Sequence, residues 1–102
     1  MKIIAIEEHW NSVNIRDALD RLPDGARDES VAFNTMGGNQ ARLEDIGQGR
    51  IEAMDAAGID VSILSVVTPA TQALPAADAV PLARAALSSF RQSSTCCVIG
   101  WA

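Results

Sequence analysis

The segment DVSILSVV, residues 60–67, decides the fold of this chain. It is apolar on both sides of the pleat except at Ser62 and Ser65, and this pattern is typical of a parallel strand that helices cover on both faces. Thr68-Pro69 ends the strand, because proline has no N–H for the hydrogen-bond ladder. We therefore expect an α/β fold.

Helical periodicity lies on both sides of this strand. Residues 43–57 predict a helix that ends at Gly58, where a left-handed C-cap favours a residue without Cβ. Its inner face is expected to carry Ile51, Met54 and Ala57. Its outer face is expected to carry three charged residues, Arg50, Glu52 and Asp55. After the strand, residues 75–86 predict a helix with four apolar residues on one side: Ala79, Leu82, Ala83 and Ala86.

The N-terminal part adds another strand and another helix. Residues 2–6 are too few and too β-branched to start a helix and predict a short buried strand. Residues 14–22 predict a helix capped by Asn14. Residues 26–40 show no period and predict a long loop. The order of strand, helices, strand and helix is the start of a βαβα arrangement.

Composition excludes several classes of partner. The chain has 102 residues, enough for one small domain, and a net charge of −5. Without a basic patch we expect neither nucleic acid nor an anionic membrane as a partner. Only four apolar residues separate Lys2 from two glutamates, too few for a signal peptide, so a cytoplasmic location is the expectation.

The two cysteines, Cys96 and Cys97, are neighbours in the sequence. Adjacent Cα atoms lie about 3.8 Å apart, below the usual separation in a disulfide. The pair also lacks the two-residue spacer of a zinc knuckle or a thioredoxin motif. We interpret both as reduced thiols rather than as a redox or metal-binding pair.

The motif Glu7-Glu8-His9 follows the first apolar run. Side chains alternate along a strand, so Glu7 and His9 are expected on one face and Glu8 on the other. A carboxylate and an imidazole in this arrangement can both reach one divalent cation. Two ligands do not complete a catalytic site, and the chain has no other histidine. From the motif alone, a solvated strand end is the more common interpretation.

Two blocks of the sequence resemble a known family. AIEEHW, residues 5–10, is similar to the opening Ala-Leu-Glu-Glu-His-Phe of the amidohydrolase-related enzymes in the amidohydrolase superfamily, the group containing γ-resorcylate and aminocarboxymuconate-semialdehyde decarboxylases. The second block follows at matching spacing and comprises Asp45, Gly47, Arg50, Met54-Asp55, Gly58-Ile59-Asp60 and Leu64-Ser65. Residues 66–86, including Pro69, are similar too. The resemblance thus covers residues 1–86, and two blocks at the right distance make it strong.

The resemblance implies the first two βα units of a distorted (β/α)₈ TIM-type barrel with one divalent metal, zinc or manganese, at its C-terminal mouth. The family's first-strand metal ligands map onto Glu7 and His9. A histidine and an aspartate from later strands complete the family's site, and neither has a counterpart here. Glu8 is expected to face outward as a supporting group, and Trp10 to pack in the family's Phe position. Barrel enzymes build their sites at the C-terminal ends of strands, where Glu7 and His9 are expected.

The resemblance also implies a reaction class. In decarboxylating members the metal, acting as a Lewis acid, binds the substrate's carboxylate and adjacent hydroxyl while a carboxylic acid protonates the ring carbon. In hydrolytic relatives the metal activates water. The complete enzyme would therefore decarboxylate a small aromatic or unsaturated carboxylic acid, or hydrolyse its substrate. We expect this chain alone to be inactive, because it provides only two ligands.

From residue 87 the sequence departs from the family. Residues 87–102 contain both cysteines, four serines and no acidic residue. We therefore expect two parts: residues 1–86 as the N-terminal portion of the barrel, and residues 87–102 as an aberrant or unstructured tail. A shifted reading frame, an unspliced intron and a mispredicted end are all open as its origin. A strand containing Val98, Ile99 and Trp101 on the exposed sheet edge ranks below these.

Three interpretations of function stay open. The first, which the density of motifs favours, is an N-terminal fragment of an amidohydrolase-type enzyme. The second is an interaction fragment that pairs with a full-length relative, and the third is a non-functional truncated product. Two parallel strands leave unpaired edges and uncovered apolar faces, so we also expect self-association through the strand edges.

Overall fold

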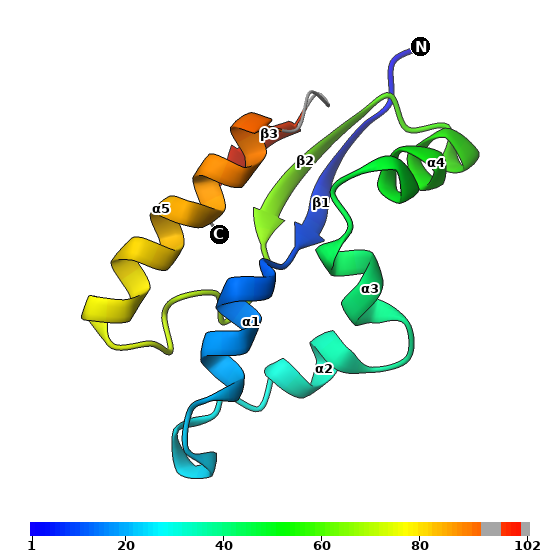
Figure 1. Cartoon of the computed structure of the whole chain (residues 1–102). Coiled ribbons are helices and arrows are strands. Elements are labelled where there is room, and N and C mark those ends of the chain that lie inside the picture. The colour runs from blue at the N-terminus through cyan, green and yellow to red at the C-terminus, as the bar shows by residue number, and fades with distance from the viewer. Residues whose placement is uncertain (93–96, 101–102) are drawn as a thin grey trace.

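A parallel sheet and the helices packed against it form the fold (Figure 1). The structure is a computed structural model that describes the backbone of residues 1–92 and 97–100 and the side chains of residues 1–89. The strands follow the order β1 (Ile4–Trp10), β2 (Val61–Val66) and β3 (Cys97–Gly100). The longer helices are α1 (Val13–Asp20), α4 (Gln48–Ala57) and α5 (Ala76–Gln92). The expected α/β fold with parallel strands is confirmed, and β3 adds a strand to the two that were expected.

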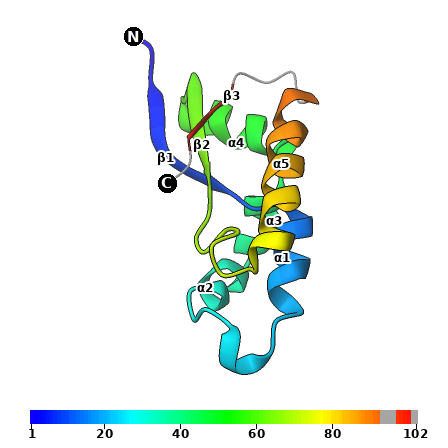
Figure 2. The same cartoon turned by 90° about the vertical axis from the view of Figure 1, so that its left-hand side faces the viewer.

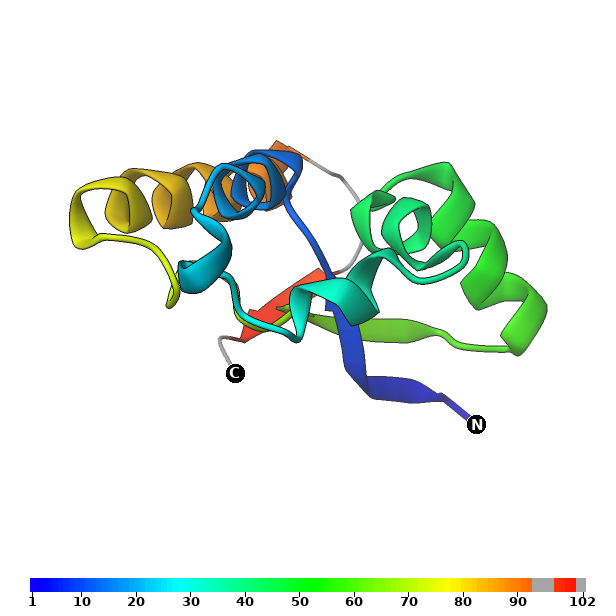
Figure 3. The ribbon, with the colours of Figure 1, turned by 90° about the horizontal axis from the view of Figure 1, so that it is seen from below.

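The helices cover only one face of the sheet. Figure 2 and Figure 3 both show α1, α4 and α5 on the same side of β1 and β2. Burial along β2 follows this arrangement, because Ser62, Leu64 and Val66 are buried while the residues between them are half-buried. The expectation of helices on both faces was therefore wrong for this chain. We call the other side, which carries Ile4, Val61 and Ile63, the open face.

Strand β1 is longer and less buried than expected. It runs to Trp10 because its ladder with β2 continues through His9↔Ser65 and Trp10↔Val66, after a register shift between Ala5 and Glu8. Ile4 and Ile6 are 52% and 68% exposed, so the prediction of a buried strand over residues 2–6 was wrong. Strand β1 is also an edge strand, because only β2 pairs with it among the described residues.

The core lies between the sheet and the helices α1 and α5. It consists of seven buried residues: Trp10, Ile15, Leu19, Leu64, Val66, Ala70 and Ala86. Trp10 packs here, as expected. The predicted inner face of α5 is also confirmed, with Ala86 buried and Ala79, Leu82 and Ala83 half-buried.

The segment between α1 and α4 is more ordered than a loop. It contains η1 (Asp24–Ala26), α2 (Val31–Thr35) and α3 (Asn39–Glu44), where a loop over residues 26–40 was expected. Helix α1 begins at Val13 rather than after Asn14, because the Arg16 N–H donates to the Ser12 carbonyl (2.9 Å) and closes the first turn there.

The predicted helix over residues 43–57 is two helices, α3 and α4, joined by residues 45–47. The chain is extended at Asp45 and turns at Gly47, which breaks the helical path. At the other end, Gly58 has a φ of 71° and caps α4 as predicted. Ile51 and Met54 are half-buried as expected, whereas Ala57 is exposed.

The C-terminal part contains regular structure in the described residues. Helix α5 continues to Gln92, and Cys97–Gly100 pairs with β2 in parallel, an arrangement that the sequence ranked lower. The division at residue 86 and the origin of residues 87–102 stay predictions. Cys96 and Trp101 lie outside the described residues, as does the side chain of Cys97. No helix within residues 1–92 is long and apolar enough to cross a membrane.

Candidate functional site

Arg50 of α4 lies beneath β1 and binds three backbone carbonyls. Its Nη2 donates to the carbonyls of His9 (2.9 Å) and Arg42 (3.0 Å), and its Nε donates to the carbonyl of Asp45 (2.7 Å). Only 13% of its side chain is exposed. The prediction that Arg50 faces water was therefore wrong, because the guanidinium connects β1, α3 and the turn before α4.

The turn over residues 45–49 positions Arg50. The Asp45 carboxylate accepts a hydrogen bond from the Gly47 N–H (2.8 Å) and also lies against Gly49. A Cβ at Gly49 would collide with this carboxylate, so a larger residue there would force the Asp45 side chain to move. The turn ends α3, starts α4 at Gln48 and directs the third residue of α4 toward β1.

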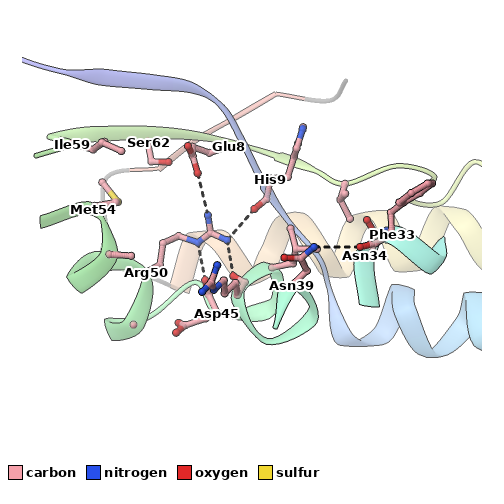
Figure 4. Close-up of a pocket in the computed structure, with 15 residues that line it drawn as sticks. Glu8, His9, Phe33, Asn34, Asn39, Asp45, Arg50, Met54, Ile59 and Ser62 are labelled. Carbon is pink, nitrogen blue, oxygen red and sulfur yellow. Dashed lines mark hydrogen bonds and ion pairs between the residues drawn. The ribbon is translucent and has the colours of Figure 1, made fainter. Parts of the chain in front are cut away.

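A cleft of about 810 Å³ lies between the sheet and the helices α3 and α4. Glu8, Asp45, Arg50 and Met54 are among its lining residues, as Figure 4 shows. The Glu8 carboxylate points into the cleft, where its Oε2 lies 4.0 Å from Nη1 of Arg50. Glu8 was predicted to be a supporting group. The structure shows Arg50 as its contact, on the helix-covered side of the sheet.

The His9 imidazole points away from this cleft (Figure 4). Its Nδ1 lies 2.9 Å from the hydroxyl oxygen of Ser65, the residue directly opposite it on β2. Glu7 is exposed in the irregular part of β1 between Ala5 and Glu8. The expected alternation holds for Glu8 and His9, which lie on opposite faces of the strand.

The residue types of Glu7 and His9 fit part of a divalent metal site. A carboxylate and an imidazole are ligands that zinc and manganese both accept. Nε2 of His9 has no hydrogen-bond partner among the side chains that the structure describes. Across those same side chains, no three His, Cys, Asp or Glu residues gather closely enough to hold a metal ion. Within the described residues Glu7 and His9 therefore stay predicted donors, and no third donor lies with them.

Sequence reasoning found Glu7, Glu8 and His9 but assigned no role to two further residues. Arg50 was placed on the outer face because its spacing matches the polar side of α4. Ser65 was seen only as an interruption of an apolar strand. Both residues belong to the second block of the family resemblance, and this was the feature of the sequence that could have identified them.

The chain is similar in structure to several solved decarboxylases. A 5-carboxyvanillate decarboxylase from Sphingomonas paucimobilis superposes with a TM-score of 0.73 at 23% identity, over 96% of this chain and 33% of the decarboxylase. A 2,6-dihydroxybenzoate decarboxylase in complex with 2,6-dihydroxybenzoate gives 0.65 at 28% identity, over 97% and 29%. A dihydroxybenzoic acid decarboxylase from Polaromonas sp. JS666, with bound manganese and 2-nitroresorcinol, gives 0.65 at 28%, over 100% and 30%.

The chain has the fold of the first βα units of an amidohydrolase-superfamily decarboxylase. The family resemblance seen in the sequence is thereby confirmed. The chain spans about a third of the length of these decarboxylases. No family model matches the sequence, and no curated protein matches it either.

Proposed function

We propose that this chain supplies the first metal-binding strand of a divalent-metal-dependent decarboxylase for a small aromatic or unsaturated carboxylic acid. The observation that carries the proposal is the similarity to dihydroxybenzoate decarboxylases over almost the whole chain. His9 lies near the carboxyl end of β1 and Glu7 at its middle, and barrel enzymes place their catalytic groups at the carboxyl ends of strands.

Glu7 and His9 would hold the metal through a carboxylate oxygen and the Nε2 nitrogen. A bound divalent cation supplies Lewis-acid chemistry toward a substrate oxygen. Arg50 would fix the main chain of His9 from beneath the strand, since its guanidinium binds the His9 carbonyl. The remaining ligands and the proton donor would come from later strands of a complete barrel, so we expect residues 1–102 alone to be inactive.

Manganese and zinc are both compatible with these donors, and the manganese in the Polaromonas decarboxylase supports a divalent ion. Hydrolysis is the second reaction that the family resemblance implies, and decarboxylation is preferred because the similar structures are decarboxylases. The cytoplasmic location stays a prediction.

Manganese titration followed by NMR tests the metal ligands. The chain has one histidine, so its ring signals are unambiguous. Mn²⁺ is paramagnetic and broadens signals close to it, and it prefers oxygen and imidazole ligands to the thiols of Cys96 and Cys97. We expect Mn²⁺ to broaden the His9 ring signals in the wild type and in Glu8→Gln. In Glu7→Ala we expect no such broadening. Equal broadening in the wild type and Glu7→Ala would remove Glu7 from the site.

A chimera tests the reaction. Residues 1–86 would replace the corresponding segment of the 2,6-dihydroxybenzoate decarboxylase, with release of CO₂ from 2,6-dihydroxybenzoate as the measurement. We expect activity that disappears in Glu7→Ala and in His9→Ala and persists in Glu8→Gln. A folded chimera that binds manganese and remains inactive would contradict the proposed reaction.

A further inference from the structure

The His9 imidazole is held by a second strand. His9 and Ser65 are directly opposite each other on the parallel strands β1 and β2, and their side chains share the open face. Nδ1 of His9 and the hydroxyl oxygen of Ser65 are 2.9 Å apart, a hydrogen-bond distance, in a partly buried position. The ring therefore has a defined orientation in the chain as it stands.

The main chain of His9 is held from the other side of the sheet. Arg50 donates to the His9 carbonyl at 2.9 Å, so the backbone is fixed by α4 and the ring by β2. With Nδ1 directed at Ser65, the second ring nitrogen, Nε2, is the atom left for a ligand. Among the described residues it has no hydrogen-bond partner.

We propose that Ser65 is a positioning residue that accepts a hydrogen bond from Nδ1–H of His9 and so keeps the lone pair of Nε2 available for a divalent cation. This inference rests on the proposed function, because it assigns the metal-binding nitrogen of the same site. A histidine that binds a metal donates its other ring N–H to an acceptor, and that hydrogen bond fixes both tautomer and orientation. A hydroxyl oxygen is a suitable acceptor.

The other serine of β2 provides a matched control. Ser62 is only 1% exposed and lies on the helix-covered face, away from His9. Ser62→Ala therefore removes a hydroxyl from the same strand without touching the ring. Ser65→Thr keeps a hydroxyl at the site, and threonine is favoured in strands. Together with Ser65→Ala these variants separate the hydrogen bond from a general effect on the sheet.

The first readout is the tautomer of His9, from ¹⁵N NMR of the metal-free chain in mildly alkaline buffer, where a free imidazole is neutral. We expect mainly the Nδ1–H tautomer in the wild type, Ser65→Thr and Ser62→Ala. Ser65→Ala should shift the population toward Nε2–H. A wild type that is mainly Nε2–H would overturn the proposal, as would a population unchanged in Ser65→Ala.

The second readout is the affinity for Mn²⁺, measured by broadening of the His9 ring signals. We expect Ser65→Ala to weaken binding by about 10-fold or more, with Ser65→Thr and Ser62→Ala near the wild type. Unchanged affinity in Ser65→Ala would contradict the positioning role. Absence of binding in the wild type would instead reject the proposed metal site, while the tautomer measurement still decides whether Ser65 is the acceptor.

Discussion

The charged guanidinium group of Arg50 interacts mainly with backbone carbonyls. Its three hydrogen bonds are 2.7–3.0 Å long, whereas its contact with the Glu8 carboxylate is 4.0 Å and Glu8 is 41% exposed. The bonds to the carbonyls of His9 and Asp45 are partly buried, and such bonds from a charged donor stabilise more than a long ion pair in contact with water. The guanidinium group is also needed, because Nε and Nη2 donate from two separate positions, whereas an ammonium group donates from a single nitrogen.

Substitutions of Arg50 and Glu8 should separate the contribution of the hydrogen bonds to carbonyls from that of the ion pair. We expect Arg50→Met to lower the free energy of unfolding by about 2–4 kcal/mol, since the partly buried carbonyls lose a charged donor. Arg50→Lys should cost about 1–2 kcal/mol, because it keeps the charge and loses the fork. Glu8→Gln should cost less than about 0.5 kcal/mol. Urea unfolding followed by circular dichroism measures all three. A larger loss in Glu8→Gln than in Arg50→Lys would show that the ion pair dominates.

At the scale of elements, the turn between α3 and α4 divides one predicted helix into two. Asp45 accepts from the Gly47 N–H and its carboxylate occupies the space beside Gly49. Asp and Gly near a helix start are turn chemistry that periodicity alone does not detect. This turn is what places Arg50 under β1, so the error in the helix boundary and the error in the position of Arg50 have one cause.

Gly49→Ala tests the turn, and its effect should change sign with the residue at position 45. In the wild type, a Cβ against the Asp45 carboxylate should disrupt the bond to Gly47 and lower the stability by about 1 kcal/mol. In an Asp45→Ala background the collision is gone, and alanine should stabilise α4 by about 0.5–1 kcal/mol. Gly25→Ala is the control, since a Cβ there meets no atom within 4 Å. The same effect of Gly49→Ala in both backgrounds would exclude the collision.

Periodicity and turn residues predicted the elements that local chemistry determines. The strand at Val61–Val66, the cap at Gly58 and the inner face of α5 needed only the neighbouring sequence. Contacts distant in the sequence were not predictable in this way. Strand β1 extends to Trp10 because β2 pairs with it, and His9 meets Ser65 across 56 residues. The motif identified His9, while its partner depends on the register of two strands.

At the scale of the whole molecule, the sheet has one covered face and one open face. Helices bury Ser62, Leu64 and Val66, while Ile4 and Ile6 remain largely exposed. In a closed barrel the inward-facing side chains of neighbouring strands fill the interior and cover one another. Because this chain spans about a third of its barrel-like relatives, the same side chains meet solvent here. An exposed edge strand with apolar side chains favours association.

We expect residues 1–102 to self-associate through β1 in a concentration-dependent manner. Ile4→Lys/Ile6→Lys should shift the protein toward monomer, because two charges on the edge strand oppose pairing with another copy. Val80→Lys is the matched control, since Val80 is also half exposed but lies on α5. Sedimentation equilibrium at several protein concentrations measures the average mass. A wild type that is monomeric at every concentration, or an equal shift in Val80→Lys, would show that β1 does not drive association.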